Sequence, residues 1–231
     1  MKSIKTVIKY YLLVFMVIFS ITGCSEEFLG PNPMSFYSPE NTLDTPEALE
    51  SVLNTCEDFL RTEFIDRNSP ISSEMFFSDI CVEGTTDKAT KPQDLNHWLT
   101  PDGALDRIEW YWINGFRMIK CANTVISRID QPKNMSEERR NAILGTAYFH
   151  RAYWYYHLCN QFGDVPLILE EITKPRLDFN SSPREEILTQ MKEDLEFAQI
   201  WVSDNVNRGD VTKGAVSHLL TKINLALCLF D

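Results

Sequence analysis

Basic residues are scarce in this chain of 231 residues. Lys and Arg number 22 against 33 Asp and Glu, which leaves a formal charge of -11. Because a nucleic-acid partner requires a basic face that neutralises phosphates, this balance excludes nucleic acid from the expected partners. Hydrophobic residues make up 44% of the chain and aromatic residues 12%. That content is sufficient for one globular core.

Motifs that would carry catalysis are missing. The chain has no Gly-rich phosphate loop, no Gly-x-Ser-x-Gly elbow and no His-Glu-x-x-His pair among its four histidines. Nothing in the sequence indicates that two carboxylates are held at the separation that a glycosidase requires. His150 and His157 share a helix face only loosely, and we expect them to cap or edge a helical core. We therefore expect no enzyme activity, no metal site and no cofactor.

Closely spaced cysteines are absent as well. The six cysteines include no Cys-x-x-Cys pair. Cys56, Cys121, Cys159 and Cys228 fall within helical patterns, where a buried thiol behaves as a small apolar side chain. The sequence therefore predicts free thiols rather than a disulfide framework.

The N-terminal apolar run is too short for a membrane span. It extends from Tyr10 to Ile21 after a basic start, whereas a spanning helix takes roughly 20 residues. This pattern is typical of a signal peptide, which we place at residues 1–23. The tetrad that ends in Cys24 is similar to a bacterial lipobox, so we expect Cys24 to be acylated. Residues 24–44, rich in proline, would then form an extended linker.

Helical patterns dominate the rest of the chain. Apolar residues recur at intervals of three and four in five segments, each of which predicts a helix. The predicted helices run from Pro46 to Glu63, from Asp106 to Ile129, from near Ser136 to Phe162, from Pro183 through Trp201 and from Thr212 to Phe230. The fourth opens with a predicted capping box, Ser182 to Glu185. Long helices with short connections predict an all-α fold of antiparallel pairs.

The third helical segment is the most informative, because an unusually aromatic helix runs into a defined stop. From Ala142 to Phe162 no Pro interrupts it and apolar residues lie on nearly every side, which predicts burial over most of the circumference. Gly163 suits the left-handed position after the last turn, and Pro166 prevents continuation. Arg151 is the exception in this helix. We predict a structural ion pair that locks two helices, with a ligand role as the alternative.

This segment resembles the signature of the SusD/RagB family of surface nutrient-binding lipoproteins. The family pattern reads roughly Ala-x-Phe-Leu-Arg-Ala-x-x-Tyr-x-x-Leu, then Tyr/Phe-Gly-Asp-Val-Pro-Leu, and His150 departs from it where the family has Leu. The series Trp112, Phe116, Ile119 and Asn123 is also similar to the family's. The resemblance implies a tetratricopeptide-like α-solenoid with long irregular loops over residues 45–231, incomplete at the C-terminus because family members are longer.

The resemblance also implies a function. A SusD-like lipoprotein would sit in the outer membrane, face the cell exterior and hold an oligosaccharide or other nutrient for a SusC-like TonB-dependent transporter. Ser25-Glu26-Glu27 is similar to the acidic export signal of such lipoproteins, although an ordinary acidic linker fits too. The alternatives are a lipid-anchored helical scaffold for protein–protein interactions, a truncated fragment that binds nothing, and a glycoside hydrolase.

One loop has the composition of a carbohydrate platform. Sugar rings stack their CH faces on Trp, while their hydroxyls require amide and carboxylate partners. The candidate ligand-binding residues are Asn96, His97, Trp98 and Asp102, in a segment between Pro92 and Pro101 or just beyond it. Trp98 fits a hydrophobic plug under the loop equally well. The other tryptophans lie on helical patterns, where we expect core packing: Trp110, Trp112, Trp154 and Trp201.

Overall fold

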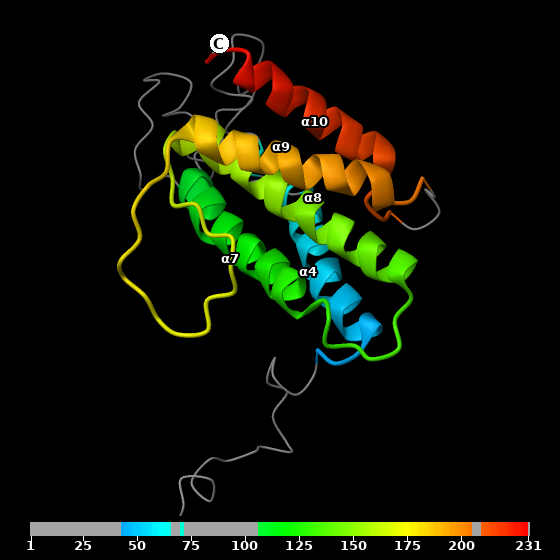
Figure 1. The fold of residues 1–231 in the computed structure, drawn as a ribbon. Helices are drawn as coiled ribbons and strands as arrows, with labels where there is room; N and C mark the ends of the chain where they lie inside the picture. The colour runs from blue at the N-terminus through cyan, green and yellow to red at the C-terminus, as the bar shows by residue number, and fades with distance from the viewer. Residues whose placement is uncertain (1–42, 66–69, 72–105, 205–208, 231) are drawn as a thin grey trace, which may run out of the picture. The chain divides into compact units, whose positions relative to one another are not determined.

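Five helices make up the regular structure of the described residues. The computed structural model describes residues 43–65, 70–71, 106–204 and 209–230. The helices are α4 (Pro46–Phe64), α7 (Asp106–Arg128), α8 (Glu137–Phe162), α9 (Arg184–Trp201) and α10 (Lys213–Leu227). From α7 to α10, each helix packs on the next one in the chain, and α4 packs on both α7 and α8 (Figure 1). The predicted all-α fold is confirmed.

Three helices start at hydroxyl caps. Thr45, Ser136 and Thr212 each accept a hydrogen bond from the backbone N–H three residues further on, at 3.2, 3.2 and 3.3 Å. Such a bond satisfies one of the free N–H groups of the first turn. The starts of α4, α8 and α10 therefore agree with the sequence to within a residue.

Helix α9 starts differently, and the predicted capping box is wrong. The cap position is held by Pro183, which makes no side-chain cap bond. The Ser182 N–H instead donates to the Val165 carbonyl at 2.9 Å, and the Asp164 carboxylate accepts from the Arg184 N–H at 2.9 Å. A carboxylate from just beyond α8 thus caps α9, where the helix dipole favours negative charge. These two bonds also join the ends of the loop between the helices.

Helix α8 lies at the centre of the fold. It contacts α4, α7, α9 and α10, and its buried residues lie on most of its faces, as predicted. A Cβ at Gly145 would lie 3.3 Å from the Ala198 Cα of α9, so the glycine permits this close helix crossing. Gly163 ends the helix with φ of 75°, a conformation that favours glycine.

The two histidines of α8 lie inside the core, so the expectation that they cap or edge it is wrong. The His157 ring stacks on Tyr111, with centroids 5.5 Å apart, and its Nε2 lies 3.8 Å from a carboxylate oxygen of Glu63. That buried carboxylate accepts hydrogen bonds of 2.6 Å from Tyr111 and Tyr153. The cluster joins α4, α7 and α8, an assembly that no local sequence pattern reports.

His150 is fully buried, and neither ring nitrogen has a hydrogen-bond partner among the described residues. Burial lowers the pKa of His150 to about 3, because an imidazolium cannot be solvated in this interior. The ring is therefore neutral at physiological pH.

The cysteines at positions 56, 121, 159 and 228 carry free thiols. Cys56 and Cys159 are buried, as a small apolar side chain would be. None of the helices described combines the length and the apolar character that crossing a bilayer requires.

Candidate functional site: a groove beside helix α7

A buried ion pair joins α8 to α9. Arg151 donates to both carboxylate oxygens of Asp194, at 2.7 and 2.8 Å, and each residue is only 4% exposed. Burial raises the pKa of Asp194, while the hydrogen bonds and charge of Arg151 oppose that rise. The predicted structural ion pair of Arg151 is confirmed. Its partner lies 43 residues further along the chain.

The same guanidinium extends the network to α7. Arg151 donates to the Asn123 side-chain oxygen at 3.0 Å and to the Leu169 carbonyl at 3.3 Å. The Asn123 amide nitrogen in turn donates to the carbonyls of Ile168 and Glu170, at 2.9 and 3.3 Å. Asn123 therefore has both ends of its side chain engaged, and it holds the segment after α8 against α7.

Tyr155 and Glu171 fasten the same segment. The Tyr155 hydroxyl accepts from the Ile168 N–H at 2.6 Å and lies 3.2 Å from the Pro166 carbonyl, to which it can donate. Burial raises the pKa of this hydroxyl, so it keeps its proton. Glu171 accepts from Arg128 of α7 at 2.9 Å. The backbone from 166 to 171 is thus held by side chains of α7 and α8.

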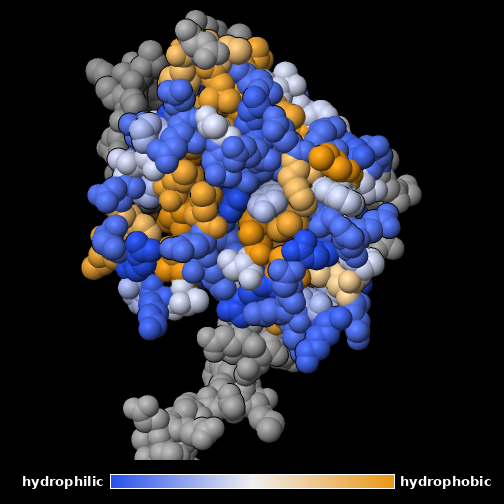
Figure 2. Space-filling view, in the orientation of Figure 1, coloured by the Kyte–Doolittle hydropathy of each residue, from blue (hydrophilic) through white to orange (hydrophobic). Residues whose placement is uncertain are grey.

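A groove of about 620 Å³ lies between α7 and this fastened segment. Its aromatic lining residues are Trp112, Phe116 and Phe179, and its polar ones include Lys120, Asn123, Glu170, Lys174 and Arg176. Trp112 is 41% exposed and Phe179 39%, so both rings reach the solvent. On the face drawn in Figure 2, apolar side chains surface in patches between hydrophilic ones.

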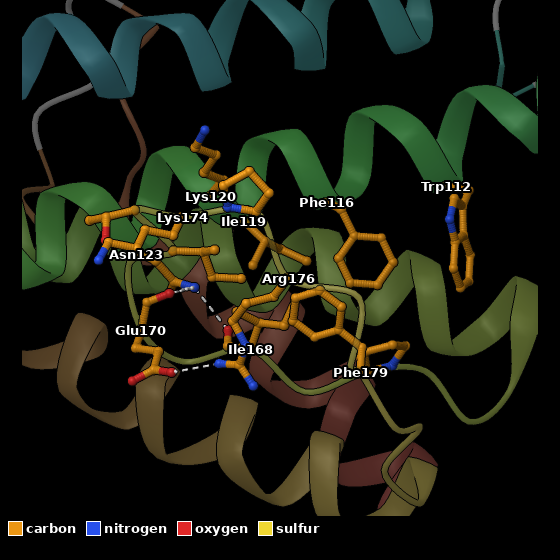
Figure 3. Close-up of a pocket in the computed structure, with 14 residues that line it drawn as sticks. Trp112, Phe116, Ile119, Lys120, Asn123, Ile168, Glu170, Lys174, Arg176 and Phe179 are labelled. Atoms are coloured by element: carbon orange, nitrogen blue, oxygen red, sulfur yellow. Dashed lines mark hydrogen bonds and ion pairs between the residues drawn. The ribbon is translucent and has the colours of Figure 1, made fainter. Parts of the chain in front are cut away.

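The groove has two chemically different ends (Figure 3). Phe116, Phe179 and Trp112 lie toward one end, whereas Lys120, Lys174 and Glu170 lie toward the other. Between them, Arg176 forms ion pairs with Asp178 at 3.1 Å and with Glu170 at 3.3 Å. Its guanidinium carbon also lies 5.3 Å from the centre of the Phe179 ring, a distance typical of a cation–π contact.

This arrangement is suited to binding. Exposed aromatic rings offer flat apolar faces, and the charged end offers hydrogen-bond donors and acceptors, which together match the amphipathic surface of a sugar. Within the described ranges, no group of three or more His, Cys, Asp or Glu side chains could hold a metal ion.

The ligand-binding and lipidation residues predicted from the sequence lie outside the described part of the chain. Asn96, His97, Trp98 and Asp102 lie in residues 72–105, and Cys24 lies in residues 1–42, both outside the described residues. The structure therefore places none of them relative to the groove, and they stay predictions.

The expectation of core packing is wrong for Trp112 and right for Trp154. Trp154 is fully buried, and Trp110 and Trp201 are partly buried. Trp112 instead stands at the aromatic end of the groove, edge-on to Phe116 and Phe162. The helical pattern around Trp112 does not predict this exposure, because the opposite wall of the groove comes from a loop more than 50 residues further along the chain. The one available signal was Ile113, whose adjacent position on the helix widens the apolar surface beyond a single stripe.

Two curated proteins are similar in sequence to this chain over part of their own length. SusD-like protein P2 from Formosa agariphila is 26% identical over 198 residues, which cover 85% of this chain and 38% of that protein. SusD-like protein P25 from the same organism is 25% identical, over 96% of this chain and 43% of the relative. The chain thus spans about two fifths of the length of these curated relatives.

Solved structures have the same fold. A laminarin-binding SusD-like protein superposes with a TM-score of 0.68 at 21% identity, over 78% of this chain and 40% of that one. A SusD-like carbohydrate-binding protein from Bacteroides vulgatus gives 0.65 at 18% identity, over 80% and 42%. Residues 27–225 match the SusD-like family profile described as "Starch-binding associating with outer membrane". Since that match covers most of the chain, the protein belongs to the SusD-like family.

Proposed function

We propose that this protein captures oligosaccharides at the cell surface and delivers them to a SusC-like TonB-dependent transporter. Capture requires no bond cleavage, because a tethered binding surface raises the local concentration of ligand over the transporter. The relatives named above include a laminarin-binding protein and a carbohydrate-binding protein, which supports the ligand class.

One observation carries the proposal: the groove beside α7 combines exposed aromatic rings with a wall that does not depend on the ligand for its position. Asn123, Tyr155 and Arg151 fix the backbone beneath it through partly buried hydrogen bonds. A preformed site loses less conformational entropy on binding than a mobile one. The loop residues Asn96, His97, Trp98 and Asp102 are proposed as further ligand contacts.

Phe179→Ala is expected to weaken oligosaccharide binding about tenfold. The substitution removes one stacking face of the groove, and an aromatic contact is worth about 0.5–1.5 kcal/mol beyond its buried area. Isothermal titration with the oligosaccharides that bind the unaltered protein measures the change. Trp98→Ala in the same titration tests the loop residues.

Leu177→Ala is the matched control. Leu177 belongs to the same loop and is fully exposed, but it does not line the groove. Its removal should leave the affinity unchanged. Equal affinities for Phe179→Ala, Leu177→Ala and the unaltered protein would place the binding site away from the groove. New reducing ends in the titrated sugar would show that the protein is a hydrolase instead.

Cys24→Ser is expected to release the protein from the membrane. The tetrad Ile21 to Cys24 is similar to a lipobox, and acyl chains on that thiol would supply the membrane affinity. Fractionation of cells that express the full sequence, followed by protease treatment of intact cells, measures anchoring and exposure. A variant that stays in the membrane fraction would contradict the lipid anchor proposed at this position.

A further inference from the structure

The geometry points to an anionic oligosaccharide as the ligand of the groove, one whose sugar rings carry carboxylate or sulfate groups. This inference rests on the proposed function, since it specifies the ligand class of the same site. It depends on the charges that line the groove and on their separation from the aromatic rings.

The charged end of the groove has two lysines that form no ion pair within the described part of the chain. Lys120 and Lys174 both line it, both are exposed, and neither forms an ion pair with any residue that the structure describes. The chain as a whole carries a formal charge of -11. Free lysines around a groove in an acidic protein create a local positive potential, which attracts an anion and rejects a cation.

Two carboxylates near that end share one guanidinium. Glu170 contributes its carboxylate to Arg176, at 3.3 Å, and Asp178 binds the same guanidinium at 3.1 Å. Arg176 carries one positive charge against these two carboxylates, so together with Lys120 and Lys174 the five side chains keep a net charge of +1. The hydrogen bonds of its own backbone carbonyl go to Asn123, so the position of this residue is fixed without a ligand.

The two ends offer different kinds of contact, which suits a sugar chain better than a lone anion. Phe116 and Phe179 lie toward the aromatic end, and Lys120 and Lys174 toward the other (Figure 3). One ring of an oligosaccharide can stack on the aromatic faces while an anionic group of a neighbouring ring reaches the ammonium groups. A cavity of about 620 Å³ is within the range of sites that hold ligands of this size.

The test uses glycans in pairs that differ only in charge. The full-length protein is applied to an array that holds polygalacturonate beside its methyl ester, and sulfated galactans beside their desulfated forms, together with neutral glucans and an acidic peptide. We expect binding to the charged member of at least one pair and at least tenfold weaker binding to its neutral partner. The carboxylate and sulfate pairs distinguish the two sources of charge.

The double variant Lys120→Gln/Lys174→Gln connects the preference to the groove. It should lose about tenfold in affinity for the charged glycan, because two charge-assisted contacts are removed, and its affinity should depend less on salt. Lys133→Gln, which removes an exposed lysine elsewhere on the surface, should change neither.

The outcomes distinguish a failure of the anionic ligand from a failure of oligosaccharide capture itself. Binding to neutral glycans alone would overturn the anionic ligand, and so would a loss of affinity in Lys133→Gln as large as that in the double variant. Either result would leave oligosaccharide capture standing. Binding to the acidic peptide without any glycan, or binding to nothing on the array, would overturn both.

Discussion

Arg151→Met is expected to lower the free energy of unfolding by about 3–5 kcal/mol, because it leaves Asp194 as a buried carboxylate without its cation. Asp194 is 4% exposed and accepts both of its short hydrogen bonds from this guanidinium. The carbonyl of Leu169 and the side-chain oxygen of Asn123 lose a donor at the same time. Urea unfolding followed by circular dichroism measures the loss.

The double variant Arg151→Met/Asp194→Leu is the control. It removes both charges, so the desolvation cost disappears and part of the lost stability should return. Asn123 and Leu169 still lack their donor, so recovery should be incomplete. A single variant that loses less than about 1 kcal/mol would show that the ion pair does not lock α8 to α9.

His150→Leu is expected to raise the free energy of unfolding at pH 7 by about 1–3 kcal/mol, the cost of a buried polar group without a partner. Both ring nitrogens of His150 are buried and unpartnered among the described residues, and Leu has a similar volume. His218→Leu is the matched control, since His218 is exposed and its replacement should change stability by no more than about 0.5 kcal/mol.

The advantage of His150→Leu should grow in acid. The pKa of His150 falls from 6.5 to about 3 on burial, so between these values the unfolded chain binds a proton that the folded protein does not. The unaltered protein therefore loses stability as pH falls through this range, up to about tenfold in its unfolding constant per pH unit. Unfolding at pH 7 and pH 5 measures this difference. An advantage of equal size at both values would mean that His150 becomes protonated in the folded protein.

The helices were predictable because their information is local. Cap residues, the apolar spacing of α4 and α8, and Gly163 all act within a few positions of one another, and the predicted bounds agree with the structure closely. The ion pair of Arg151 could also be anticipated, since a lone guanidinium in an apolar helix requires a carboxylate. Its partner, Asp194, could not be named, because only the packing of α8 on α9 selects it.

The groove could not be predicted from a single helix. It forms where the loop after α8 folds back on α7, so its residues are far apart in sequence and share no periodicity. The cap of α9 was mispredicted for the same reason: Asp164 reaches across that loop and takes the place that Ser182 was expected to fill. Local propensity places a cap nearby, whereas the folded chain uses whichever acceptor the tertiary contacts bring closest.

The two hydrogen bonds that join the ends of the α8–α9 loop, here called the clamp, have an evolutionary consequence: they pair Asp164 with Arg184 and Val165 with Ser182. Residues 166–171 are also held against α7 and α8, so the loop is fastened at both ends and extends away only after Glu171. Lengthening such an excursion costs little, because closure entropy grows only slowly with length. Mutation can therefore exchange the residues beyond the clamp, Lys174 and Phe179 among them, while α8 and α9 stay in register. Under the function proposed above, such exchanges would change the specificity of the groove while the helical scaffold stays the same.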